Sequence, residues 1–421
     1  MLETMELLPG IRLNCFRSDR FKQGALSIQF VRGMTKEEAA YNALLPAVLL
    51  RGTEKNPDLR AITWRLDDLY GASVSALVRR IGDLQTTGLF CAFMEDRFAL
   101  AGDCILEPML EFVEELLFAP LLENGVFCEA FVESEKKNLI STIESEINDK
   151  RVYANARLRK LMCSGDSFAL SRLGEKEDVA AITAGSLYEH YKRVLDSSAV
   201  ELFYVGSAEP EAVAALLRQM FEKRKRVSAR VPEQTAFGGG AGGHETETMD
   251  VTQAKLCMGF VTPVTNRSSQ FAAMQVMNAL YGAGMTSKLF MNLREKQSLC
   301  YSISSGYYGA KGIMMVSAGI DTQKEEIARQ GILEQLKACC DGDITAAELD
   351  GAKEAIVSSL QTIHDSPGAI EGYYASGILS GLAWSPKAYA DAVAAVTAED
   401  VAEVAKTLRY HSSFCLRGEE K

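Results

Sequence analysis

Hydrophobic and polar positions along the chain follow two different periods. Short apolar runs rich in β-branched and aromatic residues predict strands at residues 26–31, 75–78, 86–92 and 200–205. Longer stretches with apolar residues three or four positions apart predict helices at residues 38–50, 105–117, 131–147 and 184–194. Thr183 is the expected N-cap of the last of these helices. Strands with short connections beside helices indicate an α+β fold, a mostly antiparallel sheet with helices on one face.

The same order of segments occurs twice along the chain. VAAITA at residues 179–184 returns as VAAVTA at 393–398, ELFYVG at 201–206 parallels SFCLRG at 413–418, and LSIQFV at 26–31 parallels LCMGFV at 256–261. A repeat on this scale is typical of an internal duplication with one domain per copy. The length of 421 residues also indicates two domains, because single cores stop growing beyond roughly 250–300 residues.

A glycine run separates the two copies. Five of the six residues at 238–243 are glycine, and glycine loses the most backbone entropy when it is ordered. A glycine-rich substrate loop is the alternative, but no strand-loop-helix phosphate motif surrounds the run, so a linker is favoured. We therefore expect an N-terminal domain at residues 1–230, a linker at 231–247 and a C-terminal domain at 248–421.

Charge and cysteine content indicate which partners and which cellular compartment to expect. The formal net charge is −11 and the pI about 5.2, which disfavours binding to the phosphate backbone of nucleic acid. The first residues lack the basic and apolar regions of a secretory signal, and no apolar run reaches the ~18 residues of a membrane span. The ten cysteines include no C-x-x-C pair. A cytoplasmic protein with reduced thiols is expected.

Two segments carry a resemblance to a known family. One is ALLPAVLLRGT at residues 43–53, and the other is GAGMTSKLFMNLREKQSLCY at residues 282–301. Together with the order of the segments, they resemble the pitrilysin/insulinase family of zinc peptidases over nearly the whole chain. The resemblance implies two related α+β domains, each a mostly antiparallel sheet covered by helices, joined by a linker as half of a clamshell.

The first segment lacks the residues that bind metal in active members of that family. Those members carry an inverted zinc motif, H-x-x-E-H, on a helix. By resemblance, Ala43 and Ala47 stand at the histidine positions and Pro46 at the position of the catalytic base. Alanine has no side-chain lone pair, and proline has neither a carboxylate nor an N–H. Proline would also disturb the helix unless it lies in the first turn.

The third zinc ligand of the family is a glutamate on a later helix, and Thr142 occupies its position in the expected register. Glu144 or Glu146 would take its place if the register slips. Because zinc needs three or four good donors, we expect no metal or other cofactor in this chain. An active peptidase with an unusual metal site built around these glutamates is a minor alternative.

The second segment keeps the family pattern. By resemblance, Arg294 and Tyr301 contact the backbone of a peptide substrate. An arginine keeps its charge and donates to carbonyl oxygens, and a tyrosine hydroxyl can stabilise a developing oxyanion. The alternative is structural: Arg294 pairs with a nearby acid and Tyr301 packs at the edge of a core.

These features predict a subunit that has lost one half of an active site and kept the other. In some bacterial members the two halves lie on separate chains, so the resemblance implies a heterodimer with a homologous, zinc-containing peptidase subunit. Its substrate would be a peptide or unfolded polypeptide, and this chain would be inactive alone. The alternatives are a zinc-less scaffold protein and a maturation accessory factor, such as the branch associated with the aminopentanol modification of elongation factor P.

Overall fold

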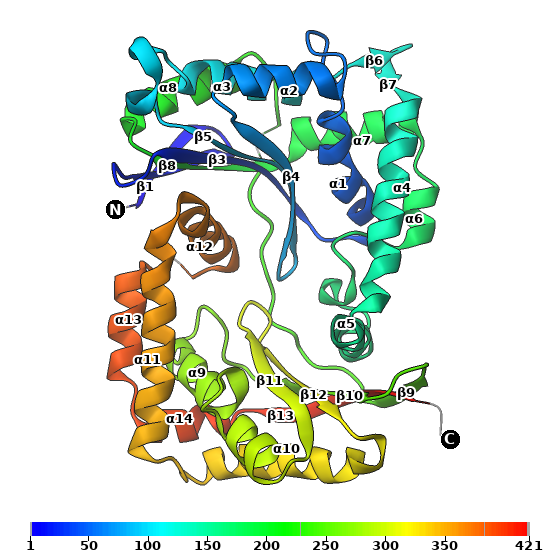
Figure 1. The fold of residues 1–421 in the computed structure, drawn as a ribbon, viewed down its shortest axis with the longest axis vertical. Coiled ribbons are helices and arrows are strands. Elements are labelled where there is room, and N and C mark those ends of the chain that lie inside the picture. The colour runs from blue at the N-terminus through cyan, green and yellow to red at the C-terminus, as the bar shows by residue number, and fades with distance from the viewer. Residues whose placement is uncertain (1, 228, 383, 419–421) are drawn as a thin grey trace. The chain divides into compact units, whose positions relative to one another are not determined.

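The chain forms two compact units, each assembled from three stretches of sequence. The computed structural model describes residues 2–227, 229–382 and 384–418. Unit 1 comprises Met1–Glu144, Leu170–Glu233 and His364–Leu379, and unit 2 comprises Ser145–Ala169, Gln234–Ile363 and Ser380–Lys421 (Figure 1). Each unit therefore takes one short piece from the opposite half of the sequence.

Unit 1 is built on a six-stranded sheet in the order β1-β2-β8-β3-β5-β4. All neighbours are antiparallel except β2 and β8. The strands are β1 (Leu2–Leu8), β2 (Ile11–Arg17), β3 (Gln23–Gly33), β4 (Ser73–Ile81), β5 (Leu84–Met94) and β8 (Ala199–Gly206). A two-stranded ribbon, β6 (Leu122–Glu123) and β7 (Val126–Phe127), lies apart from it.

Helices cover one face of this sheet and enclose the larger core. They are α1 (Lys36–Leu49), α2 (Leu59–Asp68), α3 (Leu106–Phe118), α4 (Glu129–Ser145), α6 (Lys176–Ala180), α7 (Ala184–Ser197) and α8 (Pro210–Glu222). Leu26, Ile28 and Phe30 of β3 point into this core, where α1, α3, α7 and α8 contribute aliphatic side chains. Alternate residues of a strand face opposite sides, so Ser27 and Gln29 lie on the other face.

The second face of this sheet is covered by α12 (Pro367–Ser380), which comes from the far end of the chain (Figure 1). Its Glu371 is 1% exposed. The Glu371 carboxylate accepts hydrogen bonds from Ser27 Oγ (2.6 Å), Gln29 Nε2 (3.0 Å) and both terminal nitrogens of Arg79 (2.9 and 2.7 Å). Helices on one face were expected. The second layer is needed because β3 is buried on both faces along most of its length.

Unit 2 repeats the topology with a five-stranded sheet in the order β11-β12-β10-β13-β9. Its strands are β9 (His244–Thr248), β10 (Ala254–Val261), β11 (Cys300–Tyr308), β12 (Ile313–Ile320) and β13 (Arg409–Arg417). Its helices are α9 (Phe271–Asn278), α10 (Glu325–Cys340), α11 (Ala346–Thr362), α13 (Pro386–Ala395) and α14 (Ala398–Ala405). β10 pairs with β12 and β13 as β3 pairs with β5 and β8.

The helix exchange is reciprocal. Helix α5 (Lys150–Met162) belongs to the first half of the sequence but packs in unit 2, where Leu158 and Met162 join Cys257 and Phe414 in one apolar cluster. Each sheet thus receives one helix from the other copy.

The predicted α+β class, with mostly antiparallel sheets covered by helices, is confirmed. The duplicated threonines behave alike, since Thr183 and Thr397 each close a capping box at the start of a helix. None of the helices within the three described ranges is both long and apolar enough to cross a membrane.

Candidate functional site

Helix α1 carries Ala43, Pro46 and Ala47, the residues expected at the positions of the zinc motif, and continues through the proline. It begins after Thr35, whose side chain accepts from the backbone N–H of Glu38, and it ends at Leu49 with Pro46 inside it. A proline has no N–H, so the carbonyl of Asn42, four residues earlier, has no helical partner. Thr87 Oγ1 donates to that carbonyl over 2.7 Å. A hydroxyl from strand β5 therefore satisfies the acceptor, and the helix continues for another turn.

The four residues expected at the zinc-motif positions have no imidazole, thiol or carboxylate side chain that could bind zinc. Ala43 and Pro46 are buried and Ala47 is half-buried on α1. Thr142 lies exposed on α4 and donates to the carbonyl of its own helix at Asn138 (2.9 Å). Within the part of the chain that the structure describes, no cluster of three or more histidine, cysteine or acidic residues has a metal-binding arrangement. A zinc ion does not fit these residues, because zinc requires three or four nitrogen, sulfur or oxygen donors.

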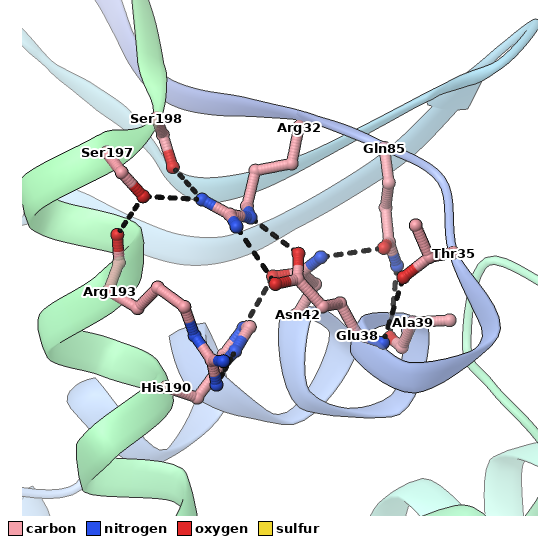
Figure 2. A network of polar contacts seen from close by, with 10 residues as sticks. All are labelled: Arg32, Thr35, Glu38, Ala39, Asn42, Gln85, His190, Arg193, Ser197 and Ser198. Carbon is pink, nitrogen blue, oxygen red and sulfur yellow. Dashed lines mark hydrogen bonds and ion pairs between the residues drawn. The ribbon is translucent and has the colours of Figure 1, made fainter. Parts of the chain in front are cut away.

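A buried polar network lies beside this segment of α1 (Figure 2). Asn42 Nδ2 donates to Gln85 Oε1 (2.9 Å), and Gln85 Nε2 donates to the carbonyls of Ala39 (3.1 Å) and Arg172 (2.7 Å). Asn42 Oδ1 is thus left as an acceptor toward His190 Nε2, 2.8 Å away. The network ties α1, β5 and α7 together.

This arrangement determines the tautomer of His190. Its Nε2 must carry the proton that Asn42 accepts, and Nδ1 is left as an acceptor. His190 is fully buried, and burial lowers the pKa of its imidazole to about 4; the nearby charges of Arg193 and Arg32 lower it as well, while Glu38 opposes them. A neutral imidazole is the form that the network requires.

Unit 2 contains the second candidate half-site. The segment that carries the family resemblance forms two π-helical turns, Ala279–Ala283 and Leu289–Lys296, followed by a tight turn into β11. Gln297 N donates to Asn292 O over 3.2 Å, an i to i+5 bond that widens the end of the helix. Arg294 lies in the last turn of this helix, and Tyr301 is the second residue of β11. A short connection therefore brings the two residues into one region.

Arg294 and Tyr301 line the same cavity, whose volume is about 340 Å³. Tyr301 is 59% exposed, and among the described residues its hydroxyl has no hydrogen-bond partner. The Arg294 guanidinium lies 4.5 Å from the centroid of the Phe290 ring, and its Nε is 3.7 Å from Glu295 Oε1. Such an exposed ion pair is weak, so most of the donors of Arg294 remain available to a ligand.

The turn between these two residues is strained and charged. Ser298 has a positive φ of 49°, an unfavourable conformation for a residue other than glycine. Ser298 O accepts from Lys324 Nζ over 3.3 Å, which holds the turn. Glu295, Asp321 and Lys324 also line the cavity. Strain of this kind concentrates where a loop must present side chains in a particular direction.

Comparison with known proteins agrees with this fold. Residues 181–356 match the family described as "Peptidase M16 inactive domain". A Bacillus subtilis strain 168 protein named "Probable inactive metalloprotease YmfF" is 31% identical over 98% of this chain and 96% of its own length. This chain therefore belongs to the peptidase M16 family, also called the pitrilysin family.

Two further proteins are similar to this chain over most of its length. A solved structure of a conserved protein from Enterococcus faecalis V583 superposes with a TM-score of 0.91 at 26% identity, over 100% of this chain and 99% of that one. A second Bacillus subtilis strain 168 protein, the antilisterial bacteriocin subtilosin biosynthesis protein AlbE, is 25% identical over 77% of this chain and 83% of its own.

Several residues around these sites were not identified from the sequence. Pro46 within a helical pattern was a usable signal, because it implies that some side chain must satisfy the carbonyl of Asn42. No local sequence pattern marked Gln85 or His190 as neighbours of Asn42. Gln85 lies 43 positions from Asn42 in the sequence, and His190 lies 148 positions from it.

Proposed function

We propose that this chain is the non-catalytic subunit of a two-subunit zinc peptidase and that it binds the substrate backbone through Arg294 and Tyr301. A homologous partner would carry the H-x-x-E-H motif, the zinc ion and the catalytic base. The observation that carries the proposal is the cavity that Arg294 and Tyr301 share, in a chain whose α1 contains no histidine.

The chemistry of the cavity suits a peptide. A guanidinium presents several N–H donors in a plane and can bind successive backbone carbonyls without losing its charge. The free hydroxyl of Tyr301 can donate to a carbonyl oxygen, and more strongly as that oxygen gains negative charge during hydrolysis. The volume of the cavity, about 340 Å³, lies at the lower end of the range for small-ligand sites, which suits a short peptide segment.

The first experiment is to isolate the tagged chain from its native cells and identify what co-purifies. A protein of similar size that carries H-x-x-E-H, recovered in equal amount, is the expected result. If the chain is recovered alone or as a homodimer, the two-subunit proposal fails.

The second experiment tests the two residues in the reconstituted complex. Arg294→Ala and Tyr301→Phe are each expected to lower kcat/KM by on the order of 10²-fold, the usual effect of removing one transition-state donor. Lys296→Ala is the matched control, because Lys296 lies on the same helix and is exposed, and its ammonium group donates to Asn292 Oδ1 (2.9 Å) and does not line the cavity. Full activity in both variants would exclude their role in substrate binding.

A second candidate function is peptide maturation without cleavage by this complex. The similarity to a protein named for subtilosin biosynthesis supports it. In that case the cavity would hold a peptide for another enzyme to modify. Binding of peptides by the isolated chain, with no zinc-containing partner in the cells, would favour this alternative.

A further inference from the structure

Unit 1 contains a cavity that the proposed peptidase role does not use, although Arg32, Glu38 and Arg193, whose charges act on His190, also line it. It has a volume of about 440 Å³ and lies between the end of β3, the start of α1 and the end of α7. We call it the arginine pocket, because three arginines, Arg32, Arg193 and Arg230, line it together with Thr35, Glu37 and Glu38. A concentration of arginine is unexpected in a chain with a net charge of −11.

The first of these arginines is fully engaged by the protein. Arg32 forms a two-pronged ion pair with Glu38, with Nε to Oε2 at 2.6 Å and Nη2 to Oε1 at 2.9 Å. Its Nη1 lies 3.2 Å from the hydroxyls of both Ser197 and Ser198 (Figure 2). Arg32 therefore neutralises Glu38 and forms part of the wall.

Neither of the other two guanidiniums forms an ion pair within the described residues, although the charge of Arg193 also acts on Glu38, which Arg32 pairs. Arg193 is exposed, and Arg193 Nη2 lies 3.5 Å from His190 Nδ1 (Figure 2). Because the tautomer of His190 leaves Nδ1 as an acceptor, the imidazole can steer this guanidinium without cancelling its charge. Arg230 is also exposed and, within the described ranges, makes no hydrogen bond or ion pair.

The charges that remain in the pocket favour an anion. With Arg32 and Glu38 paired, Arg193 and Arg230 face a single acid, the exposed Glu37. The pocket is large enough for a small organic molecule and much larger than one inorganic anion needs. Guanidinium groups bind carboxylates and phosphates through paired, charge-assisted hydrogen bonds.

We propose that the arginine pocket binds a small oxyanion ligand, whose phosphate or carboxylate group is held by Arg193 and Arg230. This site does not depend on the proposed peptidase role, because every residue that forms it belongs to unit 1 and Arg294 and Tyr301 belong to unit 2.

The test is calorimetric titration of the full-length protein with inorganic phosphate and, separately, with citrate, at ionic strength held constant with sodium chloride. Saturable binding of one anion per chain is expected for at least one probe. Arg193→Ala and Arg230→Ala should each weaken it about tenfold or more, the usual effect of losing a charged hydrogen bond. Lys192→Ala is the matched control, because it removes a positive charge from the same helix outside the pocket, where Lys192 pairs with Glu189 (2.6 Å).

The two probes distinguish the source of the anion. Saturation by phosphate alone indicates a phosphate-bearing ligand, and saturation by citrate alone indicates a carboxylate, and either result supports the site. Absence of saturation by both probes across the millimolar range overturns it. So does an equal loss of affinity in Lys192→Ala, because the effect would then be one of overall charge. Circular dichroism of each variant confirms that the comparison is made between folded proteins.

Discussion

The hydroxyl of Thr87 donates to the backbone carbonyl of Asn42, the carbonyl to which residue 46 would donate if it were not proline. A residue of strand β5 thus completes the hydrogen bonding of helix α1 from outside the helix. Pro46, the residue expected at the position of the catalytic glutamate, removes one hydrogen bond from the helix, and the hydroxyl of Thr87 supplies a replacement donor.

The first prediction concerns this hydrogen bond. Thr87→Val keeps the shape of the side chain and removes the donor, so a buried carbonyl loses its partner. We expect the free energy of unfolding to fall by about 1–3 kcal/mol, measured by urea denaturation. In a Pro46→Ala background the new N–H of residue 46 can donate to the carbonyl of Asn42. The decrease in unfolding free energy caused by Thr87→Val should then be markedly smaller. Equal costs in the two backgrounds would contradict this account.

The second prediction concerns Glu371, which joins α12 to the sheet of unit 1. Glu371→Ala removes the acceptor for Arg79, Ser27 and Gln29 at once. We expect a loss of about 3–5 kcal/mol in the free energy of unfolding, because breaking a buried ion pair leaves the partner charge uncompensated. Glu371→Gln, which keeps the size and one carbonyl acceptor, should cost less. Asp391→Ala, at an exposed ion pair with Lys387, is the control and should change little.

The third prediction follows from the reciprocal helix exchange. A protease site inserted after Gly238, where the chain is open to solvent, would divide the protein between its two sequence halves. Because α5 is packed in unit 2 and α12 in unit 1, the two fragments should stay together after cleavage. Size-exclusion chromatography of the cut protein should show one peak at the mass of the intact chain. Separation of the fragments in native buffer would show that these helices contribute little to holding the halves together.

The fourth prediction is a pH dependence from His190. Its folded-state pKa is lowered to about 4 from the ordinary value of 6.5, mainly by burial, so the unfolded chain binds a proton more readily. The contribution of His190 to stability is therefore complete above pH 6.5 and is lost as the pH falls toward 4. The expected loss is on the order of 2–3 kcal/mol between pH 7 and pH 4.

The variant His190→Gln isolates this contribution. Glutamine does not titrate and can still donate to Asn42 Oδ1. The difference in unfolding free energy between neutral and acid pH should therefore be smaller in this variant than in the wild type. An unchanged pH dependence would mean that other groups cause the acid instability.

Local pattern was sufficient for the elements that form the scaffold. The predicted strands fall within β3, β4, β5 and β8, and the predicted helices coincide with most of α1, α3, α4 and α7. These segments have clear periodicity because one side of each faces a core. The duplication was also readable, since equivalent strands must present similar apolar faces to equivalent neighbours.

The sequence by itself determined the α+β class, the duplication and the absence of zinc ligands at residues 43, 46 and 47, because each depends on residue type and local spacing. Only the tertiary structure decided that α5 and α12 are exchanged between the units, that Thr87 completes the hydrogen bonding of a helix interrupted by proline, and that Arg193 and Arg230 share a pocket. Those facts depend on contacts between residues far apart in the chain. Such contacts arise from the packing of whole elements, so they cannot be predicted from the order of the residues along one segment.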